Sequence, residues 1–553
     1  MPNPYLSMID IFVENIIEHD DPYLYARSLQ KDEYEHWEKD NEWVHASVAN
    51  YAITLAYSYI GPESRWSGNK DVLLYAEKTI KHLVNAAVDD RWYHRKPRMG
   101  DANIDRFTAL PLIESIHLLG NILSSEIRDN ALKKLDAVLQ IQLCEYGERG
   151  RIYPNMDAYY CLIMWHGHEL LGRQEYRDEY LRFLQKMETA QFEEGAWTYI
   201  EGTNECPVYH DINVLLMGRL ATFAKSERAM AMIRKSIPYY PQVIASCGMV
   251  ESYTDPWWKH MWNSPCSYGP DTVSSLTGDG HNRWIADLLR IQTNQEAVQP
   301  SSNIRSIFLV YAASMWKDVL PEPVSDETIT YDKNIEGPRG RFAKWLWAAS
   351  GRYGCDTVVG AMSNSFHDGK ISALLGIRPE IFYRPAGGED HGVDRHALGM
   401  TPRGSKGNTK IDDRAARFEV IYGMADHRLI WNEEPFPRAW ECIQRWTMDA
   451  EKLCGHIEII SLNDQESHFP IIRIRWGRNG CIEEKGDGRF IYGPFSFTAK
   501  GDNFPLYAIE KSKTMPCRKE LDAWDIVFST GQYQGFCQKG LKFNFFIDIA
   551  FTE

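Results

Sequence analysis

One stretch of the chain, residues 191–211, combines residue types that could act together on a substrate. It reads QFEEGAWTYIEGTNECPVYHD and connects two segments whose apolar residues recur at helical spacing. Asp211 is predicted to cap the second of these helices. A loop held by two helices can point several polar groups at one spot, so Asn204, Tyr209 and His210 are candidates for a reactive cluster. The alternative is a capped, well-packed helix connection without chemistry.

A second polar loop, residues 94–107, leads into another predicted helix. Arg106 stands where that helix begins and could bind a substrate carboxylate, because a guanidinium can make two parallel hydrogen bonds to it. Asn103 is a further candidate for substrate binding. The alternative for Arg106 is a surface ion pair with Asp101 or Asp105.

A third loop, residues 251–272, contains the sequence DPWWKHMW. Its rings Trp257, Trp258 and Trp262 could form stacking platforms for sugars, or they could plug the core beneath the loop.

The C-terminal half contains a long Gly-rich loop, residues 384–408. His391 is a candidate for substrate binding, and a solvated lid is the default interpretation of the loop. The spacing between His391 and His396 matches no standard zinc pattern, so no cofactor is expected, and a structural metal in this loop is the alternative.

Composition and charge limit the classes of function. The chain has 553 residues, which predicts two or three domains, and its 44% apolar and 25% charged residues are typical of a soluble globular protein. A net charge of −15 argues against a nucleic-acid partner, although a local basic groove could still bind an acidic substrate. The 18 Trp and 29 Tyr modestly favour carbohydrate, because aromatic rings offer flat surfaces to sugars.

The sequence gives several indications of compartment. No stretch reaches the roughly 18 apolar residues that span a bilayer, and the start lacks the pattern of a signal peptide. The 11 cysteines are scattered among apolar neighbours, as free thiols in a reducing compartment would be. A cytoplasmic protein without a membrane partner is expected. The alternative is a secreted or periplasmic protein whose signal peptide has been removed.

Periodicity divides the chain into a helical part and a strand-rich part. Long polar loops alternate with short turns along the helical part, as they do in helical hairpins that place every second connection at the same end. Closed into a ring, such hairpins would surround one cleft with these loops. Alternating strand patterns and hairpin-type turns follow, and predict stacked antiparallel sheets. The predicted domains are a helical toroid at 1–320, a linker at 321–340 and a β-sandwich at 341–553. The predicted helices are 43–59, 72–87, 107–123, 130–143, 158–171, 180–190, 212–224, 227–237, 284–291 and 304–319.

A ring of helical hairpins followed by an antiparallel β domain resembles the toroid-plus-sandwich polysaccharide lyases, which act on alginate, glucuronan, hyaluronan, chondroitin and heparin-like chains. Those enzymes commonly carry a Q-x-x-x-G-x-W/F turn followed by a polar loop with His. Here Gln191, Gly195 and Trp197 lead on to His210. The resemblance implies an (α/α) toroid with the catalytic site, an acidic polysaccharide or oligosaccharide as substrate, and a substrate contact for Trp197.

A lyase of this kind removes the proton next to a uronate carboxylate, which is poorly acidic while that carboxylate stays charged. The site must therefore neutralise the carboxylate, supply a base, and protonate the leaving glycosidic oxygen. The resemblance implies that His210 is the base or the carboxylate partner and that Tyr268 is the acid/base tyrosine. The structural alternatives are a helix-start histidine tied to a neighbouring group and a packed loop tyrosine.

The remaining roles are divided among four residues. Asn155 and Asn204 compete for the amide that binds the carboxylate. Tyr209 is the second choice for the tyrosine and His260 for the histidine.

Two other functions fit the same fold. A glycoside hydrolase on a helical ring would need two carboxylates across the cleft, and Asp157, Glu201, Glu205 and Asp211 lie in suitable loops. A glycan-binding protein without catalysis would turn over no sugar polymer.

Overall fold

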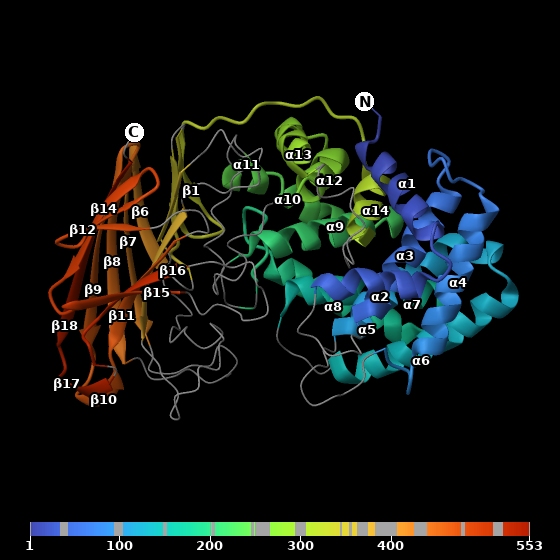
Figure 1. Ribbon diagram of the computed structural model, residues 1–553, viewed down its shortest axis with the longest axis horizontal. Coiled ribbons are helices and arrows are strands. Elements are labelled where there is room, and N and C mark those ends of the chain that lie inside the picture. The colour runs from blue at the N-terminus through green and yellow to red at the C-terminus, as the bar shows by residue number, and fades with distance from the viewer. Residues whose placement is uncertain are drawn as a thin grey trace. The chain divides into compact units, whose positions relative to one another are not determined.

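The protein divides into two compact units, which are described separately below. The helical unit comprises Met1–Gln191, Tyr209–Ile237 and Cys266–Glu322, and the β unit comprises Phe192–Val208, Pro238–Pro265 and Pro323–Glu553. In Figure 1 the colour runs from blue and green in the helices to orange and red in the C-terminal strands. The computed structural model describes residues 2–33, 43–92, 103–146, 152–199, 201, 205–244, 248, 266–293, 306–342, 345–352, 357–361, 374–381, 406–424, 439–476, 482–511, 524–532 and 534–551.

The helices form an inner and an outer set. Inner helices such as α3, α7 and α14 are buried on nearly every side, whereas outer helices such as α4, α8 and α10 bury one face. The inner set is α3 (Trp43–Ile60), α5 (Asn103–Leu119), α7 (Pro154–Leu171), α9 (Pro207–Phe223), α12 (Tyr268–Thr277) and α14 (Ser306–Met315). The others are α1 (Pro4–Ile17), α2 (Pro22–Glu33), α4 (Lys70–Ala86), η1 (Gly120–Ile122), α6 (Ser125–Tyr146), α8 (Gln174–Ala190), α10 (Glu227–Lys235), α11 (Tyr239–Val243) and α13 (Gly280–Thr293).

A buried polar network joins the inner helices α5, α7, α9 and α14. Arg219 of α9 donates from Nε to Oε1 of Glu114 on α5 at 2.7 Å, and Nε2 of His166 on α7 lies 3.4 Å from the other oxygen of that carboxylate. Each of these three residues stands about three turns from the start of its helix. The hydroxyl of Tyr311 on α14 donates to Glu114 at 2.6 Å. The ring closes because α14 packs against α3 and α3 against α5.

Burial alone would raise the pKa of Glu114, but Arg219, His166 and Tyr311 together lower it from 4.5 to about 2. Because the folded-state pKa is depressed, the stabilisation is present above the unfolded value and is lost as pH falls toward 2. We expect Glu114→Gln to lower the free energy of unfolding at neutral pH by about 3 kcal/mol, since Arg219 is left buried without its carboxylate. Urea titration measures this against the exposed control Glu126→Gln. A loss below about 1 kcal/mol contradicts it.

Several helices begin earlier than their apolar periods predict. Pro154 and Pro207 occupy the first positions of α7 and α9, where a missing N–H costs nothing, so Asp211 lies inside α9 and does not cap it. Helix α12 begins at Tyr268, inside the predicted loop 251–272, and was missed because Gly, Pro, Ser and Thr conceal its period. An Asp in the first turn of α5, α7 and α12 is the signal that locates these starts.

The β unit contains two eight-stranded antiparallel sheets and one two-stranded sheet within the described residues. Their orders are β1-β2-β3-β4-β5-β11-β16-β15, β12-β13-β14-β18-β9-β8-β7-β6 and β10-β17. The strands are β1 (Thr328–Asp332), β2 (Gly337–Arg341), β3 (Trp345–Ala349), β4 (Thr357–Ala361), β5 (Leu374–Ile381), β6 (Lys406–Asp412), β7 (Ala415–Met424), β8 (Trp440–Asp449), β9 (Lys452–Ser461), β10 (Gln465–His468), β11 (Pro470–Trp476), β12 (Glu483–Gly486), β13 (Arg489–Tyr492), β14 (Phe495–Gly501), β15 (Leu506–Lys511), β16 (Trp524–Ser529), β17 (Gln534–Cys537) and β18 (Lys542–Phe551).

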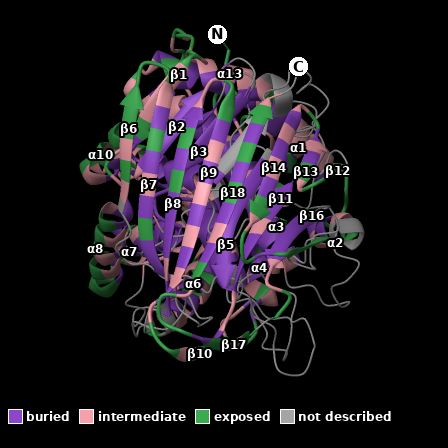
Figure 2. Cartoon of the chain, turned by 90° about the vertical axis from the view of Figure 1, so that its left-hand side faces the viewer, coloured by how far each residue is buried: buried purple, intermediate pink, exposed green. Residues whose placement is uncertain are grey.

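One hydrophobic core joins the inner faces of the two large sheets. Figure 2 shows buried residues alternating with exposed and intermediate ones along β7, β8 and β18, as expected for strands with one covered face. Two glycines make room for core tryptophans across the ladder. A Cβ on Gly340 would lie 2.4 Å from the ring of Trp347, and one on Gly455 would lie 2.3 Å from the ring of Trp446.

The structure differs from the predicted domain boundaries in two places. The predicted linker at 321–340 contains β1 and most of β2, whose Pro, Gly and acidic residues masked a short edge hairpin. Residues 192–208 and 238–265, predicted inside the toroid, cluster with the β unit. The order of a helical toroid followed by an antiparallel β-sandwich is otherwise as predicted.

Candidate active site

The first turns of α5, α7, α9 and α12 form what we call the N-terminal layer of the toroid, residues 103–107, 154–160, 207–211 and 266–271. Helices α5 and α7 run parallel, because Phe107 meets Tyr159 near their starts and Glu114 meets His166 further along. Helices α9 and α12 meet near their starts through Asp211 and Cys266. Rings from successive helices meet at this layer: Phe107 lies 5.0 Å from Tyr159, and Tyr159 lies 6.4 Å from Phe308. The predicted residues Asn155, Tyr209, His210 and Tyr268 all belong to this layer or border it.

Arg106 is buried in the N-terminal layer, with 1% of its surface exposed. Its guanidinium lies over the rings of Phe107, Tyr159 and Tyr160 at 4.8, 5.5 and 5.6 Å. Within the described residues its Nε and Nη1 have no hydrogen-bond partner. Asp105 is not its partner, because that carboxylate accepts from the backbone N–H of Trp92 at 2.8 Å.

Asn155 and Asp157 stand in the first turn of α7. Asn155 is half-buried and lies eleven residues before His166, a spacing that returns a helix to the same face. The carboxylate of Asp157 accepts from the backbone N–H of Tyr153 at 2.7 Å. Burial raises the pKa of Asp157 to about 6, against the lowering effects of Lys186, of that hydrogen bond and of Arg106. Asp157 therefore has the electrostatic character of a general acid.

His210 is 1% exposed in the first turn of α9, and burial lowers the pKa of its imidazole well below the ordinary value. The ring is therefore neutral, which is the form a general base requires. Nine residues separate His210 from Arg219, so it lies on the opposite side of α9 from that inward-facing arginine. If His210 is catalytic, it must reach the substrate at the end of the ring where α9 begins. Tyr209 is half-buried beside it.

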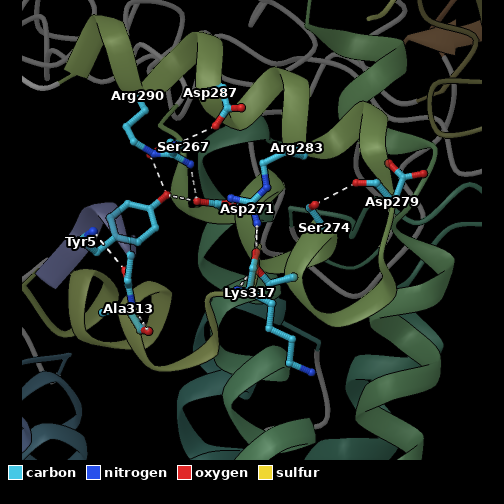
Figure 3. Close-up of polar contacts among 12 residues, drawn as sticks. Tyr5, Ser267, Asp271, Ser274, Asp279, Arg283, Asp287, Arg290, Ala313 and Lys317 are labelled. Carbon is cyan, nitrogen blue, oxygen red and sulfur yellow. Dashed lines mark hydrogen bonds and ion pairs between the residues drawn. The ribbon is translucent and has the colours of Figure 1, made fainter. Parts of the chain in front are cut away.

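Tyr268 is the half-buried first residue of α12. Asp271, three residues further on, is the centre of a buried polar network (Figure 3). The hydroxyl of Tyr5 donates to Asp271 at 2.5 Å, and the ring of Tyr5 meets that of Tyr268 edge-on at 5.5 Å. Arg290 donates to Asp271 from α13 at 2.6 Å. No local pattern could reveal this anchor, because Tyr5 is 266 residues away from Asp271.

The starts of α9 and α12 lie side by side. Cys266, two residues before Tyr268, lies with its Sγ 3.5 Å from Oδ2 of Asp211, the residue after His210. This contact brings the two segments of the predicted acid/base pair together.

The Gln-Gly-Trp turn has a structural role. Gln191 donates to the carbonyl of Met232 at 2.9 Å, Gly195 adopts a positive φ of 94°, and Trp197 is 1% exposed. Trp197 is as deeply buried as Arg106 and His210, and its substrate contact stays a prediction.

The carboxylates required by a hydrolase are only partly grouped. Glu201 is exposed, and Glu205 is fully buried in an ion pair with Arg339 of the β unit. Asp157 and Asp211 remain in the N-terminal layer.

The other predicted site residues lie outside what the structure describes. They are Asn204, Trp257, Trp258, His260, His391 and the side chain of Asn103, which is the first residue of α5. Among the described residues, no three His, Cys, Asp or Glu side chains are placed to hold a metal ion. No helix within the described part is long and apolar enough to cross a membrane.

Comparison with known structures supports the fold. No family model and no curated protein sequence matches this chain. The chain is similar to the chondroitin AC lyase of Streptomyces coelicolor, solved in complex with chondroitin sulphate, with 12% identity, coverage of 100% of this chain and 83% of that one, and a TM-score of 0.53. A heparinase III structure shows 10% identity, coverage of 94% and 79%, and a TM-score of 0.46. The predicted fold class and its resemblance to the toroid-plus-β-sheet lyases are thereby confirmed.

Proposed function

We propose that this protein is a polysaccharide lyase that cleaves a uronate-containing glycan by β-elimination. The observation that carries the proposal is the buried guanidinium of Arg106 in the N-terminal layer, whose Nε and Nη1 have no hydrogen-bond partner within the described residues. The aspartates of the layer have partners of their own, such as the backbone N–H of Trp92 for Asp105 and Arg290 for Asp271. A guanidinium with free donors can bind a carboxylate even in a chain with net charge −15. The similarity to a chondroitin lyase fold agrees with this substrate class.

In the proposed reaction, Arg106 and the amide of Asn155 bind the uronate carboxylate and reduce its effective charge. His210, neutral because it is buried, takes the proton from the carbon next to the carboxylate. The electron pair left on that carbon forms the carbon–carbon double bond and breaks the bond to the glycosidic oxygen. Tyr268 gives that oxygen a proton. The products are an unsaturated uronide and a new chain end.

Incubation with a panel of uronate polymers, including chondroitin sulphate, tests the proposal. Lyase activity makes a conjugated double bond, so ultraviolet absorbance rises in step with the new reducing ends. Flat absorbance across the panel contradicts the proposal.

A hydrolase is the second candidate, and the raised pKa of Asp157 favours it. Hydrolysis would release reducing ends without any rise in absorbance. Asp157→Asn would then stop turnover, whereas a lyase would retain most of its activity.

The Arg106→Met variant is expected to lower kcat/KM about 10- to 100-fold, through both kcat and KM, because the lost guanidinium binds the substrate carboxylate and also reduces its charge as the neighbouring proton leaves. Steady-state kinetics on an active polymer measure this. Arg182→Met is the matched control, since Arg182 also lies over a ring, that of Phe183 at 4.5 Å, but on outer helix α8. If Arg106→Met loses only stability and keeps its KM, Arg106 is a packing residue.

A further inference from the structure

The segment that leads into α9, residues 192–206, is attached through its described residues Ala196 and Glu205 to the first hairpin of the sandwich, formed by β1 and β2. Both belong to the β unit. The backbone N–H of Ala196 donates to the side chain of Asn334 in the hairpin turn at 3.1 Å, and both residues are fully buried. At the start of the loop, the guanidinium of Arg352 lies 4.0 Å from the ring centroid of Phe192. The loop is thus held at several points.

Its last point of attachment is a buried arginine shared by two carboxylates. Arg339 of β2 lies with Nη2 3.3 Å from Oε1 of Glu205 and 2.8 Å from Oδ2 of Asp332, and its Nε donates to the same Asp332 oxygen at 2.9 Å. Glu205 and Asp332 are fully buried and Arg339 is 3% exposed. A buried carboxylate needs such a partner, because isolated burial of a charge is very unfavourable. One guanidinium therefore connects the loop to both strands of the hairpin.

This attachment lies next to the proposed catalytic segment. One residue, Cys206, separates Glu205 from Pro207, where α9 begins, and His210 follows in the first turn. A displacement of Glu205 also moves the start of α9, because only two planar, rigid peptide bonds separate them. A shift of about 1 Å in a catalytic group is enough to slow a reaction about 100-fold.

We propose that Arg339 is a positioning residue: by binding Glu205 and Asp332 together, it fixes the loop 192–206 and so sets the place of the first turn of α9. The proposal rests on the proposed lyase function for its kinetic consequence, but the fixing of the loop is independent of any activity.

Two measurements on the full chain test this. Arg339→Met should speed hydrogen exchange of peptides covering residues 192–210 at least about 10-fold, since the loop loses its buried anchor. The same variant should lower kcat at least about 10-fold on an active uronate polymer, with KM changed less than about 3-fold. Glu205→Gln keeps the shape of the side chain and leaves the Arg339–Asp332 pair intact, and it should change both quantities in the same direction by a smaller factor.

Lys333→Met is the matched control, because Lys333 sits in the same hairpin but its side chain forms an exposed ion pair with Glu193. It should leave both readouts within about 2-fold of the wild type. Unchanged exchange in both the Arg339→Met and Glu205→Gln variants overturns the proposal, and so does faster exchange with an unchanged kcat. If the wild type cleaves no uronate polymer, the lyase proposal fails by itself, and the exchange measurement still decides whether Arg339 fixes the loop.

Discussion

The His210→Ala variant is expected to lose about 10³-fold in kcat on a uronate polymer, because a general base typically contributes between about 10² and 10⁴. The mechanism also predicts what happens to the substrate proton. Wild-type enzyme in deuterated water should exchange the substrate proton next to the carboxylate or eliminate it, and the variant should do neither. His168→Gln is the control, since His168 lies in the last turn of α7, where its Nδ1 is 3.1 Å from the carbonyl oxygen of Arg173. Activity within about 3-fold of the wild type would make His210 a structural histidine.

The pH dependence of kcat/KM is a second test of the role of His210. Burial lowers the pKa of its imidazole well below the usual value of 6.5, so the base stays neutral as pH falls through that value. The acid limb of kcat/KM should therefore lie well below about 6.5. Stability behaves differently: the unfolded chain binds a proton near 6.5 that the folded chain does not, so His210 destabilises the fold progressively as pH falls below that value.

The Tyr268→Phe variant is expected to lose about 10²- to 10³-fold in kcat while its stability is nearly unchanged. Removal of the hydroxyl leaves the edge-on packing against Tyr5 intact, because that contact involves the rings. If Tyr268 is the acid, the variant should still exchange the proton next to the carboxylate in deuterated water, since that step precedes protonation of the leaving oxygen. Mass spectrometry of recovered substrate measures this exchange.

A substrate analogue with a nitrophenolate leaving group separates the role of an acid from a general loss of structure. That leaving group needs no proton, so Tyr268→Phe should cleave the analogue within about 10-fold of the wild-type rate. Tyr75→Phe on outer helix α4 is the matched control. If Tyr209→Phe shows these effects and Tyr268→Phe does not, the two tyrosines exchange roles.

The sequence alone determined the order of the fold. Helical periods with long polar loops at every second connection predict a ring of hairpins, and alternating patterns after it predict stacked antiparallel sheets. These patterns are readable because each records which side of an element is buried. The same logic placed Tyr209 and His210 near the start of one inner helix and Asn155 near the start of another.

The predicted starts of several helices lie too far along the chain. Periodicity is read from apolar residues, and the first turns of these helices are polar. Asp211 and Tyr268 both sat in predicted loops for this reason, although the proline of α9 and the first-turn Asp of α12 mark the starts. The edge strand β1 and its neighbour β2 were taken for a linker because their glycines and acids make contacts with partners far along the chain.

Only the tertiary structure decided which polar residues are buried and which partners they bind. Trp197 and Glu205 stand in the same loop as His210, and folding buries the first in a core and binds the second to Arg339, 134 residues away. The same holds for Glu114 and Arg219, which are 105 residues apart and share one buried ion pair. A local pattern fixes periodicity and turn chemistry, whereas the partner of a buried charge is chosen by chain segments that meet only when the domain closes.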